Sequence, residues 1–344
     1  MSSTQILRSA PVTLRTVRVR ALLLVAAVLT SFPVTAHSRA DLSPDEISSS
    51  SPLPVVRSSE CGHGCRCSHN ATVANCSYSN LGEVPQFPSS TRVLVLDWNH
   101  IGRLTDRLGM TVTSAGNSSS RSSSLELLSV SHNNVTEISA TALDGLHALR
   151  QLRLDHNNIE RLPVAMFVDT PSLGAMSLAG NTHLDMASVG AALTPTRLSL
   201  LRLLDLSNID AVTVDGRLPE TVFSQLPALE HLVLRDVSVA NMSAEFFAAL
   251  SSACLTTLDL SGSSIGQVNE TSLEPLADSL EQLILDRAII SPRGLDAMFA
   301  GLVTANNNTR LLSLSLKNVF VEDEHSAAVG QHLFRHLITT RFHS

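Results

Sequence analysis

Aromatic residues are scarce in this chain: 3% of its 344 positions are Phe, Trp or Tyr, with a single Trp (Trp98) and a single Tyr (Tyr78). Hydrophobic residues nevertheless make up 44% of the sequence, so a core must be built from many small aliphatic side chains. Trp and Tyr are the residues that most often anchor a protein ligand. The sequence therefore offers few such anchors.

Long apolar runs are also scarce. One spans residues 21–28, after four arginines, and the small-residue step 34–36 follows it. This order is typical of a secretory signal peptide that is cleaved after Ala36. No later segment has the ~20 apolar residues that a spanning helix needs. We expect a secreted product without a transmembrane segment, or a cell-surface one if the chain is part of a longer receptor.

Basic residues are outnumbered, with 24 Lys and Arg against 31 Asp and Glu. Removal of residues 1–36 would take away four arginines and no acid, which moves the net charge from −7 to −11. An acidic field of this kind disfavours nucleic acid and heparin-like partners. We therefore predict a protein ligand and no nucleic acid.

An eleven-residue phrase recurs along the chain. It reads TRVLVLDWNHI from Thr91, LELLSVSHNNV from Leu125, LRQLRLDHNNI from Leu149 and LGAMSLAGNTH from Leu173. Apolar residues recur at its first, fourth, sixth and eleventh places, and Asn stands at its ninth. Weaker copies begin at residues 201, 229, 255, 280 and 311. Repetition at this period indicates stacked units, so the sequence predicts a solenoid with nine strands.

This phrase resembles the leucine-rich repeat family. Cys61, Cys65, Cys67 and Cys76 fall within sixteen residues ahead of the first repeat and resemble the N-terminal cap of extracellular members such as the Slit, Toll and chaoptin ectodomains. A cap covers the bare apolar end of a solenoid. The resemblance implies an α/β solenoid, a horseshoe with a concave parallel β-sheet and a disulfide-bonded cap.

Four cysteines allow three pairings, and spacing alone does not choose among them. The family resemblance implies Cys61–Cys67 and Cys65–Cys76. A zinc site is the alternative, because His63 lies among the thiols, but a secreted chain favours disulfides. We predict no metal and no cofactor, and we expect the fifth cysteine, Cys254, to be a buried free thiol.

The domain organisation follows from these features. We expect a signal peptide (1–36), a disordered Ser/Pro-rich stalk (37–60), a cysteine-rich cap (61–90), about nine repeats (91–337) with a flexible insertion (108–124), and a truncated C-terminal end (338–344).

The ninth place divides the repeats into two groups. In repeats one to four it is Asn99, Asn133, Asn157 and Asn181, whose amides can satisfy backbone groups in the turn. In repeats five to nine it is Ile209, Val237, Ser263, Ala288 and Val319. Without those amides, we expect the second half to be less rigid.

Seven N-glycosylation sequons occur, at Asn70, Asn75, Asn117, Asn134, Asn241, Asn269 and Asn307. None falls at the second, third, fifth, seventh or eighth place of the nine repeats, whose side chains should project from the concave face. We therefore expect that face to be clear of glycans.

Polar and aromatic residues gather on the concave side of repeats one to three, where neighbouring strands lie about 4.8 Å apart. They are Asp97, Trp98, His132, Arg153, Asp155 and His156. One interpretation is a ligand-binding patch with an aromatic anchor, whose affinity could follow His titration near pH 6.5. The other interpretation is that these His are solvated surface residues that commonly precede the ninth-place Asn and have no role in binding.

Two motif-like segments suggest catalysis but lack its context. Gly262–Gly266 matches G-x-S-x-G, which needs a strand-to-helix turn, yet Ile265 is the eleventh place of a repeat. His332 and His336 have no carboxylate between them. We predict no enzyme; the resemblance implies recognition of an extracellular protein through the concave face. The alternative is a structural matrix protein similar to small leucine-rich proteoglycans, and the oligomeric state stays open.

Overall fold

The computed structural model describes residues 64–68, 72–105, 108, 124–194, 198–251, 253–304 and 310–319. The expected signal peptide, stalk and C-terminal end lie outside the described residues. So do Cys61, His63, the sequons at Asn70, Asn117 and Asn307, and the pair His332 and His336.

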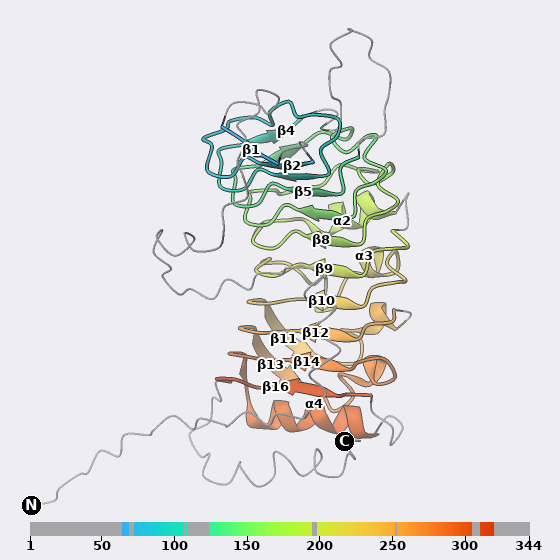
Figure 1. Cartoon of the computed structure of the whole chain (residues 1–344). Coiled ribbons are helices and arrows are strands. Elements are labelled where there is room, and N and C mark those ends of the chain that lie inside the picture. The colour runs from blue at the N-terminus through green and yellow to red at the C-terminus, as the bar shows by residue number, and fades with distance from the viewer. Residues whose placement is uncertain are drawn as a thin grey trace, which may run out of the picture.

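An eleven-stranded sheet runs the length of the described chain (Figure 1), and all its neighbouring strands are parallel except the first pair. Consecutive repeats pair in register, as Leu94 with Leu128 does. The fold is therefore a leucine-rich repeat solenoid. In order, the strands are β1 (Arg66–Cys67), β2 (Val73–Asn75), β3 (Val93–Val95), β5 (Leu127–Ser129), β7 (Gln151–Arg153), β8 (Ala175–Ser177), β9 (Leu203–Asp205), β10 (His231–Val233), β12 (Thr257–Asp259), β14 (Gln282–Ile284) and β16 (Ser313–Ser315).

The period-2 alternation of each strand decides which side chains enter the core. In β3, β7, β9, β10 and β14 the middle residue is buried, while its two neighbours are half-buried on the other face of the sheet. The middle residue is the fourth place of the phrase, and the sixth place joins it inside. We call the opposite face, which carries the third, fifth and seventh places, the concave face.

Large side chains fill the interior behind the sheet. Burying each one contributes about 1.5–3 kcal/mol, and the largest are Phe167, Phe223, Phe246, Phe247 and Phe299. Two of them, Phe223 and Phe299, belong to helices on the far side of the sheet. The elements there are α2 (Met186–Leu193), α3 (Glu220–Phe223), two 3-10 turns (Ala248–Leu250 and Glu274–Leu276) and α4 (Pro292–Thr304), which lies across the lower end in Figure 1.

The cap adds a strand of its own to the sheet. We call each strand of this sheet, together with the turn that follows it, a rung. Strand β2 is parallel to β3, with Val73, Ala74 and Asn75 opposite Val93, Leu94 and Val95. Ala74 and Cys76 are buried, as the fourth and sixth places of a repeat would be. The prediction that the strands begin at Thr91 was therefore one rung short.

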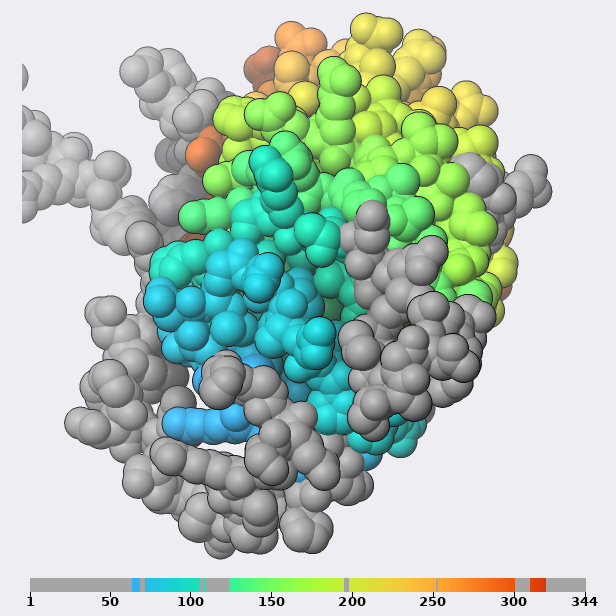
Figure 2. All heavy atoms as spheres, turned by 90° about the horizontal axis from the view of Figure 1, so that it is seen from above, coloured from blue at the N-terminus to red at the C-terminus, as the bar shows by residue number. Residues whose placement is uncertain are grey.

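Cys65 and Cys76 form a disulfide with a Cα–Cα distance of 4.1 Å, the pairing that the family resemblance implied. Cys67 is also disulfide-bonded. Viewed down the N-terminal end, the cap and first rungs lie in front of the later ones (Figure 2). The cap is thus covalently closed and continuous with the sheet.

The Asn ladder forms in the first half. The Asn133 side-chain oxygen accepts from the Ile101 N–H at 3.1 Å, and its amide nitrogen donates to the Leu96 carbonyl at 3.0 Å. Asn157 and Asn181 make the same links one rung on. Each amide therefore ties its own turn to the preceding rung.

The second half replaces this ladder with a second parallel sheet of three strands, β11 (Ser238–Met242), β13 (Ser264–Val268) and β15 (Ile289–Ile290). The backbone hydrogen bonds of this sheet satisfy N–H and C=O groups in the turns of the second half, which the sequence had left without a predicted partner. Among the described residues of the first half, the counterpart is a two-stranded sheet, β4 (Arg103–Leu104) with β6 (Glu137–Ile138). Gly266 permits the close packing of β13 on β11, since a Cβ there would lie 2.5 Å from the Ala240 carbonyl oxygen.

Three local features complete the fold. Of the expected insertion, 109–123 lie outside the described residues; Leu108 is buried and Ser124 donates to the Ser89 carbonyl. Cys254 is a free thiol but is exposed, so the expectation of burial was wrong. It directly precedes Leu255, the buried first place of repeat seven. Among the described residues, no helix has the length and apolar character to cross a bilayer.

Candidate functional site

The eighth residue of every repeat has left-handed backbone geometry. All nine, together with Tyr78 of the cap, have φ between +53° and +71°: Trp98, His132, His156, Gly180, Asn208, Asp236, Gly262, Arg287 and Asn318. Along the first rungs the N–H of this residue donates to the seventh-place carbonyl of the next rung, as Trp98 does to Ser131 at 3.0 Å and His132 to Asp155 at 2.9 Å. Because the same backbone conformation and the same hydrogen bond recur at each of these eighth-place residues, their side chains project in parallel.

In the first rungs these side chains are aromatic, and they stack. Ring centroids are 5.7 Å apart for Tyr78 and Trp98, 3.9 Å for Trp98 and His132, and 4.3 Å for His132 and His156, with interplanar angles of 8°, 8° and 12°. We call these four residues the aromatic column. It ends at Gly180, where a Cβ would lie 2.6 Å from Nδ1 of His156.

The column presents ring edges to its surroundings, because the faces of its inner rings cover one another. Tyr78 is 74% exposed and Trp98 48%. Ring edges carry the N–H groups and the positive end of the aromatic quadrupole, so a contact here favours hydrogen-bond acceptors. Left-handed geometry costs a non-glycine residue roughly 1–2 kcal/mol, and such strain tends to persist at functional sites.

The neighbouring carboxylates are already engaged. Asp97 Oδ1 accepts from the Ser129 hydroxyl at 2.6 Å and the Ser131 N–H at 2.9 Å. Asp155 Oδ1 accepts from the Ser131 hydroxyl at 2.9 Å. Desolvation by burial raises the pKa of Asp97 above its usual value, while these hydrogen bonds act in the opposite direction. Both acids therefore serve first to align adjacent rungs.

Arg153 lies on the same face, at the fifth place of β7. The side-chain amide of Gln151 has one orientation that satisfies both its oxygen and its nitrogen. In that orientation its oxygen accepts from the Arg153 guanidinium at 3.0 and 2.9 Å. The six residues singled out in the sequence thus lie on three consecutive rungs. Three of them, Trp98, His132 and His156, form one continuous stack.

Sequence reasoning missed the contribution of the cap. Tyr78 caps the column, and Val73 is a third-place residue that is 40% exposed on the concave face. Val93, Val95 and Leu127 continue this apolar strip at half-buried positions. The signal was present in residues 76–81, CSYSNL, which repeat the spacing of the sixth to eleventh places.

One sequon lies on the concave face, contrary to expectation. Asn75 pairs with Val95, a fifth-place residue, and is exposed. Its side-chain oxygen accepts from the Ser77 N–H at 3.0 Å. Counting places only from Thr91 hid this position, and a glycan here would stand beside the apolar strip. The other described sequons, Asn134, Asn241 and Asn269, are exposed away from these places.

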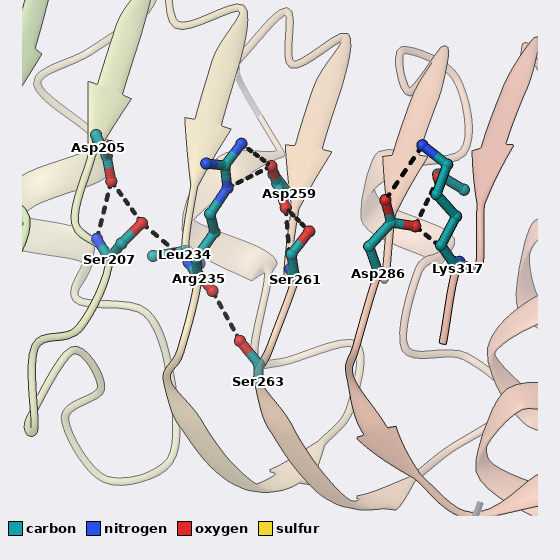
Figure 3. Close-up of polar contacts among 10 residues, drawn as sticks. Asp205, Ser207, Leu234, Arg235, Asp259, Ser261, Ser263, Asp286 and Lys317 are labelled. Carbon is teal, nitrogen blue, oxygen red and sulfur yellow. Dashed lines mark hydrogen bonds and ion pairs between the residues drawn. The ribbon is translucent and has the colours of Figure 1, made fainter. Parts of the chain in front are cut away.

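In the later repeats, Asp, Ser and Arg side chains of the concave face bond to one another, some within one repeat and some between neighbouring repeats (Figure 3). Asp205 accepts from the N–H and hydroxyl of Ser207, whose hydroxyl in turn accepts from the Arg235 N–H. Arg235 pairs with buried Asp259 at 2.7 Å. Because these groups satisfy one another, this part of the concave face has fewer polar atoms to offer a ligand.

The G-x-S-x-G match belongs to the scaffold. Ser263 is fully buried, and its hydroxyl donates to the Leu234 carbonyl at 2.9 Å and accepts from the Val237 N–H at 3.2 Å. Ser263 therefore replaces a ladder Asn. The serine of the motif is Ser264, which begins β13 and is followed in the same strand by Ile265. It does not lie on the strand-to-helix turn that the motif needs.

Comparison with known proteins finds a family match, "Leucine rich repeat", over residues 123–184. Tsukushi of Gallus gallus is 32% identical over 138 residues, which cover 37% of this chain and 35% of that protein. Toll-like receptor 9 of Homo sapiens is 30% identical over 175 residues, covering 40% and 17%. The chain thus spans about a third or less of the length of these relatives.

Two further similarities agree with this family. "Transforming growth factor beta activator LRRC33" of Danio rerio is 27% identical over 158 residues, covering 45% of this chain and 19% of that protein. Among solved structures, human 5T4 (Wnt-activated inhibitory factor 1, trophoblast glycoprotein) matches with a TM-score of 0.55 and 23% identity, covering 70% of this chain and 88% of that one. This last likeness concerns the fold.

Proposed function

Because the chain is a leucine-rich repeat solenoid with a disulfide-bonded cap, we propose that it recognises an extracellular protein through the N-terminal part of its concave face. The contact surface consists of the edges of the aromatic column and the apolar strip of Val73, Val93, Val95 and Leu127. The chain acts as a secreted or cell-surface binding module and carries out no chemistry.

The observation that carries this proposal is the contrast between the two ends of the concave face. In the first rungs the ring edges are exposed beside apolar side chains, whereas further along the polar side chains pair with one another. Binding gains most where exposed aromatic and apolar groups lose water. The N-terminal rungs fit that description, and the relatives include a receptor and a growth-factor activator.

The test needs a partner, which extracellular interaction screening can supply. Trp98→Gly removes the indole from a position whose backbone geometry suits glycine, so the fold should survive. Truncating a buried interface Trp typically costs ~2 kcal/mol or more, and we expect affinity to fall about thirtyfold.

The matched control is Arg287→Gly, which changes the same place of repeat eight, also left-handed with φ of +61°. It should leave affinity within about twofold, as should Glu220→Ala in α3 on the far side. Unchanged binding by Trp98→Gly together with a loss in Arg287→Gly would place the contact surface in the second half.

A further inference from the structure

The two histidines of the aromatic column lie next to an acid. His132, Asp155 and His156 each offer one ligand atom, and these atoms all lie within 4.8 Å of one another. Among the described residues, this is the one group of three His, Cys, Asp or Glu side chains that meets that condition. In contrast to the absence of a metal expected from the sequence, we propose that these three residues bind a divalent transition-metal ion, with Zn²⁺ the best match.

The chemistry of the donors supports this assignment. Two imidazoles and a carboxylate form a set that Zn²⁺ accepts, with bonds of about 2.0–2.2 Å, and imidazole also suits Ni²⁺ and Cu²⁺. Three protein ligands leave a position of the tetrahedron open. A ligand atom from a partner or a water molecule can fill it.

The geometry requires the donor atoms to move closer together. In a tetrahedral site two atoms bound at these lengths lie about 3.4 Å apart, whereas the three donor atoms lie within 4.8 Å of one another. The rings of His132 and His156 are nearly parallel, at 12°, and must tilt toward each other to direct their lone pairs at a common ion. His156 is exposed and at the end of the column, so its ring can make most of this rotation.

The surroundings hold the third ligand in place. The Ser131 hydroxyl donates to Oδ1 of Asp155 at 2.9 Å, which leaves Oδ2 for the ion. Partners of this kind orient metal ligands and raise affinity. The main chain contributes as well, because the Asp155 carbonyl accepts from the His132 N–H at 2.9 Å and so fixes the two ligands relative to each other.

The sole Trp of the chain lies against the proposed site, since Trp98 stacks on His132 at 3.9 Å. A paramagnetic ion bound there quenches tryptophan fluorescence, whereas an ion bound elsewhere does not. We expect Ni²⁺ to quench Trp98 in the full-length secreted protein and diamagnetic Zn²⁺ to reverse the effect. Equilibrium dialysis should then find one Zn²⁺ per chain.

Variants assign the ligands. In the double variant His132→Gly with His156→Gly, both new residues adopt left-handed backbone geometry without strain. This variant should lose the bound Zn²⁺. Asp155→Asn keeps an acceptor for Ser131 and should weaken Zn²⁺ binding at least about tenfold, the scale on which loss of even an outer partner acts. The control, His147→Ala with His183→Ala, removes two exposed histidines elsewhere and should change nothing.

Two outcomes overturn the proposal: absence of Zn²⁺-reversible quenching in the parent protein, or equal Zn²⁺ stoichiometry in the parent and the double glycine variant. Neither measurement involves a protein partner. Failure here would therefore leave the proposed recognition function intact, and failure of the binding test would leave the metal site intact.

Discussion

The imidazole of His132 lies flat on the indole of Trp98, with 3.9 Å between ring centroids and 8° between ring planes. The two residues belong to different repeats and meet because β3 and β5 pair in register. Each also has left-handed backbone geometry, φ of +59° for Trp98 and +54° for His132. The stack therefore combines a local conformational cost with a favourable contact between rungs.

Glycine at position 98 should separate these two contributions. Trp98→Gly removes a backbone cost of about 1–2 kcal/mol and loses a stacking gain of about 0.5–1.5 kcal/mol. We expect its free energy of unfolding to stay within about 1 kcal/mol of the parent value. Trp98→Ala keeps the backbone cost and should be about 1 kcal/mol less stable than Trp98→Gly. Urea unfolding followed by circular dichroism measures both, and equal stability of the two variants would contradict the argument.

Gly180 sets the end of the column. Gly180→Ala places a Cβ against the His156 ring, so it should destabilise the protein by about 1–3 kcal/mol and shift the emission of Trp98. Gly216→Ala is the control, because Gly216 has nearly the same φ, +72°, and a Cβ added there would meet no atom within 4 Å. Adding His156→Gly to Gly180→Ala removes the ring that the new Cβ meets, so it should abolish the difference in stability between the two alanine variants.

Asn75 should carry no glycan in ligand-binding protein. A glycan on this fifth-place residue would cover the apolar strip, and the following Cys76 is held in a disulfide with Cys65. Peptide mapping of protein secreted from eukaryotic cells should find Asn75 unmodified, with Asn241 as the exposed sequon for comparison. Full occupancy at Asn75 in protein that still binds its partner would move the contact surface to later rungs.

Asp205 should make stability depend on pH in the acid range. Burial raises its pKa above the unfolded value, although Ser207 and Arg235 oppose the shift. Between the two pKa values the folded state binds more protons than the unfolded state, so this residue's contribution falls as pH rises through that window. Asp205→Asn retains an acceptor for Ser207 and should be as stable as the parent or more so at neutral pH. The difference between the two should shrink as pH falls toward the unfolded pKa, in paired urea titrations.

Repeat five should be the least protected part of the solenoid. The Asn ladder ends with Asn181, and the second sheet begins at β11 in repeat six. Ile209, at the ninth place between them, has neither support. Amide hydrogen exchange should be fastest around residues 209–217 and slower on both sides. Uniformly fast exchange throughout the second half would support the simpler expectation drawn from the missing Asn residues.

The repeat phrase was sufficient to predict the solenoid, because leucine spacing fixes which side chains enter the core. It also predicted the ladder at Asn99, Asn133, Asn157 and Asn181. The phrase did not predict β11, β13 and β15. These strands pair through backbone groups, and the side chains at the paired positions differ from one repeat to the next. The period-2 pattern also separated the core positions of each strand from the concave ones. The stacking of Trp98, His132 and His156 could not be predicted from it. This stacking depends on left-handed geometry at the eighth place, which Gly180 and Gly262 and, less strongly, Asn208, Asp236 and Asn318 indicate in the sequence.

The disulfide between Cys65 and Cys76 joins the chain at a residue whose carbonyl accepts the amide of Asn99 at 2.9 Å. Reduction would thus free the strand that holds Tyr78, Val73 and Asn75, and with it the first link of the ladder. Formation of the proposed binding surface therefore depends on oxidative folding, and a chain made in a reducing compartment would lose the outer end of that surface.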